Sequence, residues 1–378
     1  MQEKAIAPNT TARVVLNGQR HFSTRVVESR SAHGKKAGRP DEAQLEPNEE
    51  SGSSSSSQSQ MEQIPFPVLR RVAICGGTHG NEMTGVFLVP ELERRKKEKG
   101  DAGRSVAFTT VLSNPRAAKE CRRYMDKDLN RCFTKDTLSC PITEDTPYEI
   151  QRAQELNSLL GPKGSDAAVD IICDLHNTTA NMGLTIISYS WSNWIGLHVF
   201  KHLQATITST PVRLVLINVP PCEAYSLESV AKYGISLEAG PQPQGIVRAD
   251  VFNFMKQAVD AILEWTEIFN SGKVIKGGEV EAYLIQKSMD FPRDATTGQP
   301  TAAIHPQLQD QDFCLLQRGD PMFLTFSGET LNYEEEQPLH PLFINEAAYY
   351  EKGIAFHLAL KKTMSIPSIR ADTDGEKN

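Results

Sequence analysis

The chain has 378 residues, with 40 lysines and arginines against 47 aspartates and glutamates, and a formal net charge of −7. This length supports a sizeable buried core and allows one domain or two. The acidic balance lacks the basic footprint of nucleic-acid-binding proteins, so a polyanion is disfavoured as a partner.

Cysteine use and hydropathy indicate the cellular setting. The seven cysteines are odd in number and never form C-x-x-C, so neither a disulfide framework nor a thiolate zinc site is predicted. A reducing, cytoplasmic setting fits best. No window approaches 18 consecutive apolar residues, and the N-terminus lacks the apolar core of a signal peptide. We therefore predict a soluble, unsecreted protein without a transmembrane segment.

Residues 1–62 are predicted to form a disordered extension. A serine-rich run at 51–57 and a charged stretch at 40–50 leave too few large apolar residues to offset chain entropy. Arginines among Ser and Thr hint at an organelle presequence, but without a convincing amphipathic period a dispensable tail is favoured. Met61 precedes the first ordered-looking segment, and mass spectrometry of the endogenous N-terminus would test whether a shorter product starts there.

Strand and helix patterns alternate between residues 63 and 272. Short apolar runs predict buried strands, and apolar residues spaced three and four apart predict helices. The predicted strands cover 71–75, 106–112, 169–175, 212–218 and 234–237, and the predicted helices cover 82–99, 149–160, 193–203 and 249–269. This alternation predicts an α/β domain with a mostly parallel sheet flanked by helices.

Past residue 272 the pattern of predicted secondary structure changes. Short strand-like pieces at 281–286 and 322–326 are separated by Pro and Gly turns. We predict a smaller, mostly β C-terminal domain at 273–366, followed by a disordered tail at 367–378.

Three polar residues stand at the predicted strand ends. His79 follows the first strand, His176 follows the strand at 169–175, and Glu238 follows the strand at 234–237. In open α/β sheets, ligands bind beyond the carboxyl ends of the strands. These side chains are therefore expected to share one edge of the sheet.

The glycine-rich stretch AICGGTHGNEMTG at 73–85 can be interpreted as a phosphate loop or as part of a metal site. It matches neither G-x-x-x-x-G-K-[ST] nor G-x-G-x-x-G, and Glu82 would repel a phosphate. His79 and Glu82, three residues apart at a strand-to-helix turn, can instead face one ion, with His176 as the third ligand. Such a set leaves a position for water and suits zinc. A rival pair, His198 and His202, has helical i, i+4 spacing but no intervening carboxylate, so ordinary helix residues are favoured there.

Five motifs together resemble the aspartoacylase/succinylglutamate desuccinylase family, relatives of the zinc carboxypeptidases. They are GGTHGNE at 76–82, DLNR at 128–131, DLHNTT at 174–179, GPQPQG at 240–245 and NEAAYYE at 345–351. The resemblance runs in consistent order from about residue 69 to 365 and leaves the N-terminal extension outside. It implies a carboxypeptidase-like catalytic domain and a C-terminal domain that caps the site.

The resemblance also implies residue roles. One zinc ion would be bound by His79, Glu82 and His176. The other implied roles are Glu238 as general base, Arg123 on the amide carbonyl, Asn130 and Arg131 on the substrate α-carboxylate, and Tyr349 from the C-terminal domain in the substrate pocket. These residue types fit the chemistry, because a zinc-bound water has a pKa near 7 and a carboxylate can take its proton. An arginine can stabilise an oxyanion or clamp a carboxylate.

One departure bears on the substrate. Aspartoacylases proper carry an arginine ten residues before the catalytic glutamate, which clamps the side-chain carboxylate of acetylaspartate. Here that position is Glu228, which would repel such a carboxylate, and Ala224 replaces a tyrosine, although Tyr225 is adjacent. The pattern resembles the aminoacylase III branch, which deacylates N-acyl aromatic amino acids and N-acetylated cysteine conjugates (mercapturic acids).

The expected activity is therefore zinc-dependent hydrolysis of such small N-acyl amino acids. The alternatives are a true aspartoacylase and a zinc-binding interaction protein without turnover. A peptide carboxypeptidase is less favoured, since a capping domain restricts substrate size. The resemblance further implies a homodimer or homotetramer, and it adds peripheral association with the apical plasma membrane as an alternative to a purely cytoplasmic location.

Overall fold

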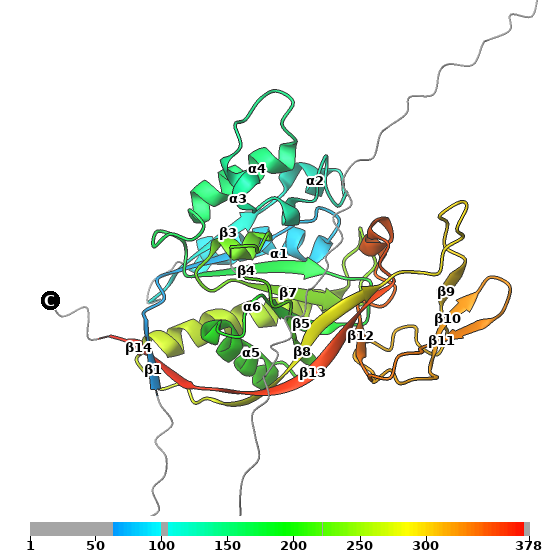
Figure 1. Ribbon diagram of the computed structural model, residues 1–378. Helices are drawn as coiled ribbons and strands as arrows, with labels where there is room; N and C mark the ends of the chain where they lie inside the picture. The colour runs from blue at the N-terminus through cyan, green and yellow to red at the C-terminus, as the bar shows by residue number, and fades with distance from the viewer. Residues whose placement is uncertain (1–62, 100–104, 221, 374–378) are drawn as a thin grey trace, which may run out of the picture. The chain divides into compact units, whose positions relative to one another are not determined.

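A computed structural model of the protein describes residues 63–99, 105–220 and 222–373. The predicted N-terminal extension lies outside these residues, as does the end of the predicted tail. The central feature is a nine-stranded sheet with the order β12-β13-β8-β6-β5-β7-β4-β2-β3 (Figure 1).

One half of this sheet is built mostly from parallel strands. β2 (Arg71–Gly76) pairs in parallel with β3 (Ala107–Leu112) and β4 (Ile171–Asn177), and β4 pairs in parallel with β7 (Ile235–Gly240). The direction reverses once, where β5 (Gly183–Ser188) runs antiparallel to β7. Parallel pairing resumes through β6 (Val212–Leu216) to β8 (Gly278–Met289). The predicted mostly parallel sheet is confirmed.

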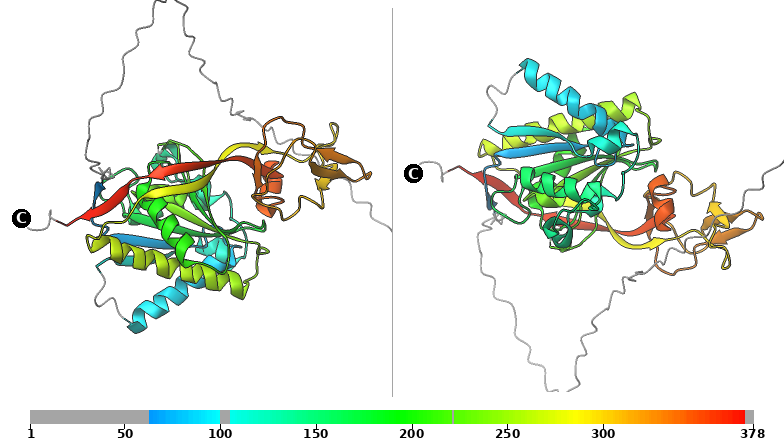
Figure 2. Two further views of the ribbon diagram at one scale, coloured as in Figure 1. Left: turned by 90° about the horizontal axis from the view of Figure 1, so that it is seen from below. Right: turned by 90° about the horizontal axis from the view of Figure 1, so that it is seen from above.

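Helices cover both faces of the sheet, as predicted. α1 (Met83–Lys99), α5 (Trp194–Thr206) and α6 (Ala249–Asn270) share the larger apolar core, and α6 runs along both other helices (Figure 2). On the opposite face, α4 (Tyr148–Leu160) and the 3₁₀ turns η1 (Leu129–Arg131) and η2 (Leu227–Val230) form a second core. Two short helices complete this side: α2 (Pro115–Lys119) and α3 (Lys135–Ser139).

The C-terminal region is both a separate β layer and an extension of the main sheet. β8 pairs along its length with β13 (Phe356–Ile366), which pairs with β12 (His340–Leu342). Beyond them, β9 (Ala302–Ile304), β10 (Pro321–Thr325) and β11 (Thr330–Asn332) form a small sheet (Figure 1). A third apolar core lies in this region. The predicted smaller β part is confirmed, but it shares the nine-stranded sheet with the α/β part through the β6–β8 pairing.

The prediction of a disordered tail from residue 367 is wrong for its first part. β14 (Ser368–Asp372) pairs in parallel with β1 (Gln63–Pro67). Ile369 and Ala371 are buried on the larger core because the short strand alternates apolar and polar residues. Apolar burial and backbone pairing together order this segment.

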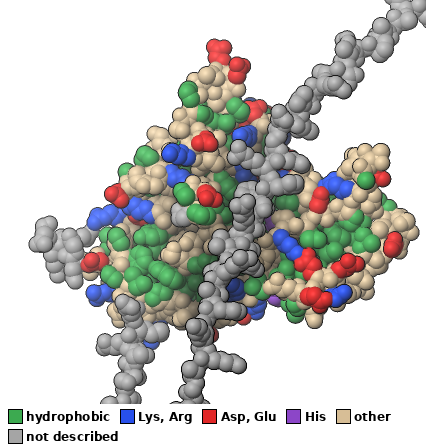
Figure 3. Space-filling model, viewed as in Figure 1, with side chains coloured by type: hydrophobic (Ala, Val, Ile, Leu, Met, Phe, Trp, Pro, Cys, Tyr) green, Lys and Arg blue, Asp and Glu red, His purple; other side chains and the backbone are tan. Residues whose placement is uncertain are grey.

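The surface charges and the hydropathy of the helices relate to two expectations, that nucleic acid is not a partner and that no segment crosses a membrane. Acidic and basic side chains are interspersed over the face seen in Figure 3. Within the described ranges, every helix is too short or too polar to cross a bilayer.

Candidate active site

The turn between β2 and α1 is shaped by two glycines. Gly77 has a φ of +66°, a conformation that side chains disfavour. At Gly80, a Cβ atom would lie 2.0 Å from the backbone carbonyl carbon of Ala117, so only glycine fits. The amide of Gly80 also donates to the carbonyl of Arg123 at 3.2 Å. The turn therefore places His79 and Glu82 on one side and draws the Arg123 loop against them.

Three buried side chains converge at this turn. The Nδ1 atoms of His79 and His176 lie 3.2 Å apart, and they approach the Glu82 carboxylate at 2.6 and 2.9 Å. Potential ligand atoms of all three lie within 4.8 Å of one another, and this is the one group of its kind in the part of the chain that the structure describes. The predicted His-Glu-His group can hold a metal ion.

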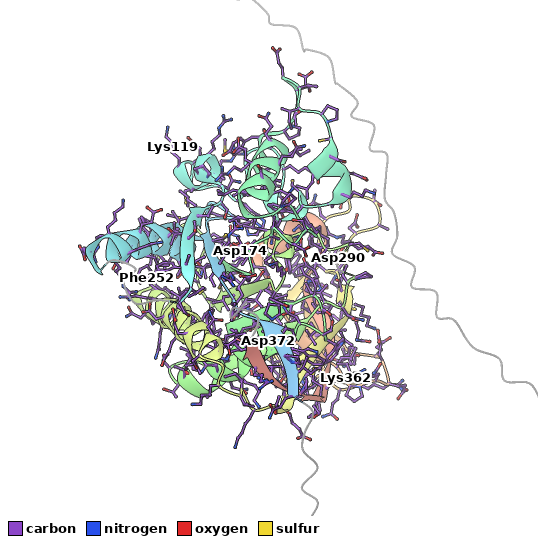
Figure 4. The ribbon with its side chains drawn as sticks, turned by 90° about the vertical axis from the view of Figure 1, so that its left-hand side faces the viewer. Lys119, Asp174, Phe252, Asp290, Lys362 and Asp372 are labelled. Carbon is purple, nitrogen blue, oxygen red and sulfur yellow. The ribbon has the colours of Figure 1, made fainter. Side chains whose placement is uncertain are left out.

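The opposite nitrogen of each imidazole meets a carboxylate. His176 Nε2 lies 2.8 Å from Asp174, and His79 Nε2 lies 3.1 Å from Asp128. Asp174 is fully buried, also accepts from the Thr78 hydroxyl at 2.7 Å, and lies in the interior of the fold (Figure 4). A carboxylate on the outer nitrogen keeps the proton there and leaves Nδ1 free for a metal. This arrangement fits a resident cation.

Glu82 is held as a carboxylate. Burial alone would raise its pKa, but the imidazoles of His79 and His176 lower the pKa well below its usual range. Its oxygens also accept from the amide of Asn177 at 3.1 Å and from Arg123 at 3.2 Å. These contacts fix an anionic oxygen donor between the two imidazoles.

Glu238 faces the same centre from the neighbouring strand. It is the register partner of His176 in the β4–β7 pair. No described side chain hydrogen-bonds its carboxyl, and burial raises its pKa to about 8. It therefore differs from Glu82 in having no fixed partner. An unpaired carboxyl of raised pKa beside a metal group is suited to accept and return a proton.

The two predicted arginines lie close to this centre. Arg123 donates to Glu82 at 3.2 Å and approaches Asp128 at 3.4 Å, and its buried Nε has no hydrogen-bond partner among the described residues. Arg131 stacks over Tyr225, with its guanidinium carbon 4.7 Å from the ring centroid. The Oδ1 atom of Asn130 accepts a hydrogen bond from the Leu227 amide at 3.0 Å, so the Nδ2 group of Asn130 does not take part in that bond.

An aromatic wall adjoins Arg131. The rings of Tyr225 and Tyr189 meet edge to face at 6.0 Å. Tyr349 comes from η3 (Ala347–Lys352) of the C-terminal region, and burial and Glu238 raise its pKa. The charge of Glu238 thus acts on the Tyr349 hydroxyl, while the pocket role expected for Tyr349 stays a prediction.

The placement of Glu228 changes its interpretation. Glu228 in η2 is only 3% exposed, and one of its carboxyl oxygens has no hydrogen-bond partner in the described part of the chain. Burial and the charge of Asp174 raise its pKa. It is therefore not an open charge lining the pocket. Its effect on an acidic substrate would come from the absence of a pairing cation and the cost of adding a carboxylate to a buried acidic region.

A glutamate that sequence reasoning left without a role attaches η3 to the site. The buried Glu346 carboxylate accepts from the hydroxyl and amide of Thr179 at 3.0 and 2.7 Å and from the hydroxyl of Thr178. It also accepts the Ala348 amide at 2.9 Å. This carboxylate therefore holds the Tyr349 turn against the strand end that carries His176.

Two further residues of this region were missed. Lys352 lies 3.2 Å from Asp128, and burial and Arg131 lower the pKa of Lys352. His357 packs edge to face on Tyr349, and burial together with Lys352 lowers its pKa to about 4.

The position of Asp174 could have been predicted from the sequence. Residues two apart on a strand point to the same face, so Asp174 and His176 share one face of β4.

The rival histidine pair lies apart from this centre. His198 is buried in α5 and bonds the carbonyl of Pro367 at 2.9 Å, and burial lowers its pKa to about 4. His202 belongs to no potential metal group among the described residues. Ordinary helix residues, as predicted, account for both.

A mostly parallel α/β sheet with a buried His-Glu-His group that could hold a metal ion at its carboxyl edge is the arrangement expected of a class, the hydrolases whose metal is bound by three protein ligands. The succinylglutamate desuccinylase/aspartoacylase catalytic domain matches residues 68–266, and the AstE/AspA barrel-sandwich hybrid domain matches residues 278–361. The chain therefore belongs to the succinylglutamate desuccinylase/aspartoacylase family.

Individual relatives are similar over most of the chain. N-acyl-aromatic-L-amino acid amidohydrolase (carboxylate-forming) B of Danio rerio is 62% identical, covering 83% of this chain and all of that protein. The Homo sapiens enzyme named N-acyl-aromatic-L-amino acid amidohydrolase (carboxylate-forming) is 48% identical, covering 82% of this chain and 96% of its own. Mus musculus aspartoacylase is 42% identical, covering 80% and 96%. The crystal structure of murine aminoacylase 3 aligns with a TM-score of 0.76 at 46% identity, covering 81% of this chain and 99% of that one.

Proposed function

We propose that this protein is a zinc-dependent amidohydrolase that converts N-acyl aromatic L-amino acids, and N-acetylated cysteine conjugates of the mercapturic acid type, into a carboxylate and a free amino acid. The observation that carries the proposal is the convergence of His79, Glu82 and His176 opposite the unpaired carboxyl of Glu238. Relatives at 46–62% identity that are named for hydrolysis of N-acyl aromatic amino acids support the same activity.

The metal would be held by the two Nδ1 atoms of His79 and His176 and by the Glu82 carboxylate. Zinc fits two imidazoles and one carboxylate, and when bound it supplies a Lewis acid and a water of lowered pKa. The carboxylates of Asp128 and Asp174 keep each imidazole in the tautomer that such binding needs.

The proposed chemistry then falls to the protein side chains. Glu238 takes the proton of the attacking water and returns it to the departing amine, for which a pKa of about 8 suits the operating pH. Arg123, whose pKa burial would lower but Glu82 and Asp128 raise above its ordinary value, stabilises the oxyanion that forms on the amide carbonyl. Arg131 and the amide nitrogen of Asn130 bind the α-carboxylate.

Substrate selection is proposed to depend on the absence of a further cation. Glu228 stands where an aspartoacylase would carry an arginine, so an acidic side chain would meet no partner there. Tyr225 and Tyr189 instead offer ring edges and faces that an aromatic side chain can pack on. This favours N-acyl aromatic substrates over N-acetylaspartate.

The proposal is tested by assaying purified protein on N-acetyl-L-tyrosine and N-acetyl-L-aspartate, with metal analysis of the same sample. We expect bound zinc, loss of turnover after chelation, recovery with zinc, and a higher kcat/KM for N-acetyl-L-tyrosine. A higher kcat/KM for N-acetyl-L-aspartate would contradict the substrate assignment and favour an aspartoacylase. Bound zinc without turnover of any acyl amino acid would favour a binding protein.

We further propose a cytoplasmic homodimer or homotetramer. All seven cysteines are free thiols, and three of them, Cys75, Cys132 and Cys173, are buried without a disulfide partner, which suits a reducing compartment. Light scattering of the purified protein would measure the assembly, and fractionation of expressing cells would separate cytoplasmic from membrane-associated protein.

A further inference from the structure

A fully buried carboxylate outside the metal-binding group holds the loop that carries Arg123 and Arg131. Glu149 lies in the first turn of α4 and is 0% exposed. Its Oε1 accepts from the Met125 amide at 2.7 Å and the Asn114 side-chain amide at 3.2 Å. Its Oε2 accepts from the amides of Asp126 and Lys127, each at 3.0 Å. Among the described residues no cation pairs with Glu149, and its hydrogen-bond partners there are four N–H groups.

The three amides that Glu149 binds lie in the middle of the segment 123–131. Arg123 precedes the three bonded amides at 125–127, and Asp128, Asn130 and Arg131 follow them. A reciprocal bond runs from the Tyr148 amide to the Asp126 carboxylate at 2.9 Å. The start of α4 and the loop are thus clamped in both directions.

The chemistry of the clamp requires a carboxylate. Two oxygens can accept from all four donors, whereas a glutamine of the same shape offers one oxygen and one NH₂ group. Whichever way that amide turns, two of the four N–H groups would face another donor. The site is therefore built for a charge and not only for a side chain of this size.

We propose that Glu149 is a positioning residue for substrate recognition, which holds the 123–131 segment so that Arg131 and Asn130 meet the substrate α-carboxylate. This inference rests on the proposed amidohydrolase function. It predicts that loosening the clamp impairs recognition of the carboxylate more than it impairs folding or metal binding.

The test compares N-acetyl-L-tyrosine with N-acetyl-L-tyrosinamide, which lacks the carboxylate. In Glu149→Gln we expect the ratio of the two kcat/KM values to fall about 10- to 100-fold, mainly through KM for the acid, with zinc content unchanged. If Glu149 contributed to stability alone, the substitution would lower kcat/KM for both substrates by the same factor. The matched control is Glu155→Gln on the same helix, where an exposed glutamate pairs with Arg152, and the ratio should not change.

A folded, zinc-loaded Glu149→Gln protein with the wild-type ratio would overturn the inference. If Glu149→Gln does not fold, Asp126→Ala provides the test, because it removes only the hydrogen bond between the exposed Asp126 side chain and the Tyr148 amide. In that variant the ratio of the two kcat/KM values should fall about three- to tenfold, and an unchanged ratio would equally overturn the inference. Failure of the proposed function looks different, since the wild-type protein would then hydrolyse neither compound.

Discussion

Asp174 offers a sharp test of how the metal centre is built. Its carboxylate is fully buried and accepts from Thr78 and His176 at 2.7 and 2.8 Å. In Asp174→Asn, an NH₂ group aimed at the imidazole would donate to His176 Nε2 and leave the proton on Nδ1, the atom that points at Glu82. The substitution therefore favours the tautomer that cannot bind a metal there.

The expected magnitude follows from the charged hydrogen bond that the substitution removes. A hydrogen bond to a charged group contributes about 1.5–3 kcal/mol, and loss of the carboxylate behind a metal-binding histidine typically costs about 10- to 100-fold in metal affinity. We expect Asp174→Asn to weaken zinc binding by about 10- to 100-fold. Asp128 supports His79 in the same way, but its carboxylate also contacts Arg123 and Lys352, so Asp174 gives the cleaner test.

The assay is zinc affinity by competition with a chromophoric chelator, on protein whose thermal unfolding is measured in parallel. Thr78→Val serves as the matched variant, because it removes the other bond to Asp174 but keeps the carboxylate, and we expect less than about a fivefold change in affinity. Zinc affinity of Asp174→Asn within twofold of the wild type would refute the reasoning.

Three further outcomes are expected. Glu238→Gln should keep its zinc and lose about 10²- to 10⁴-fold in kcat, measured with metal analysis of the same sample. Gly80→Ala should lower the free energy of unfolding by about 3 kcal/mol or more and impair metal binding, because its Cβ would overlap the backbone of Ala117; calorimetry checks this. The pKa of His198 is lowered by burial from 6.5 to about 4, so stability should be kept above pH 6.5 and lost as pH falls towards 4. Unfolding of His198→Gln should show a shallower pH slope, whereas an unchanged slope would assign the acid sensitivity to other groups.

The catalytic half of the fold was predictable because its signals are local. β2 and β4 are buried apolar runs, and α4 and α6 show helical spacing that survives in their buried faces. The glycine-rich turn then indicated where His79 and Glu82 would lie. Strand ends in a parallel sheet meet at one edge, which is why three residues far apart in sequence could be assigned to one centre.

The elements that were missed depend on pairing between distant segments. β5 follows β4 after a connection too short for a helical crossover, so it runs antiparallel against β7. β13 includes the exposed lysines Lys361 and Lys362, and its position is set by its register with β8. The contact between Lys352 and Asp128 spans 224 residues. No local pattern in the sequence encodes such a contact.

Glu82 and Glu238 show how the surroundings divide the work between two carboxylates of one site. Two imidazoles, an arginine and a backbone amide hold Glu82, and the imidazoles lower its pKa far enough to keep it ionised. Glu238 is half-buried and has no fixed hydrogen-bond partner among the described side chains, and its pKa of about 8 allows it to exchange a proton near neutral pH. Because the roles follow from the environments, the two conservative changes should differ in kind. Glu82→Gln should lose the metal and with it all turnover, whereas Glu238→Gln should retain the metal and lose only turnover.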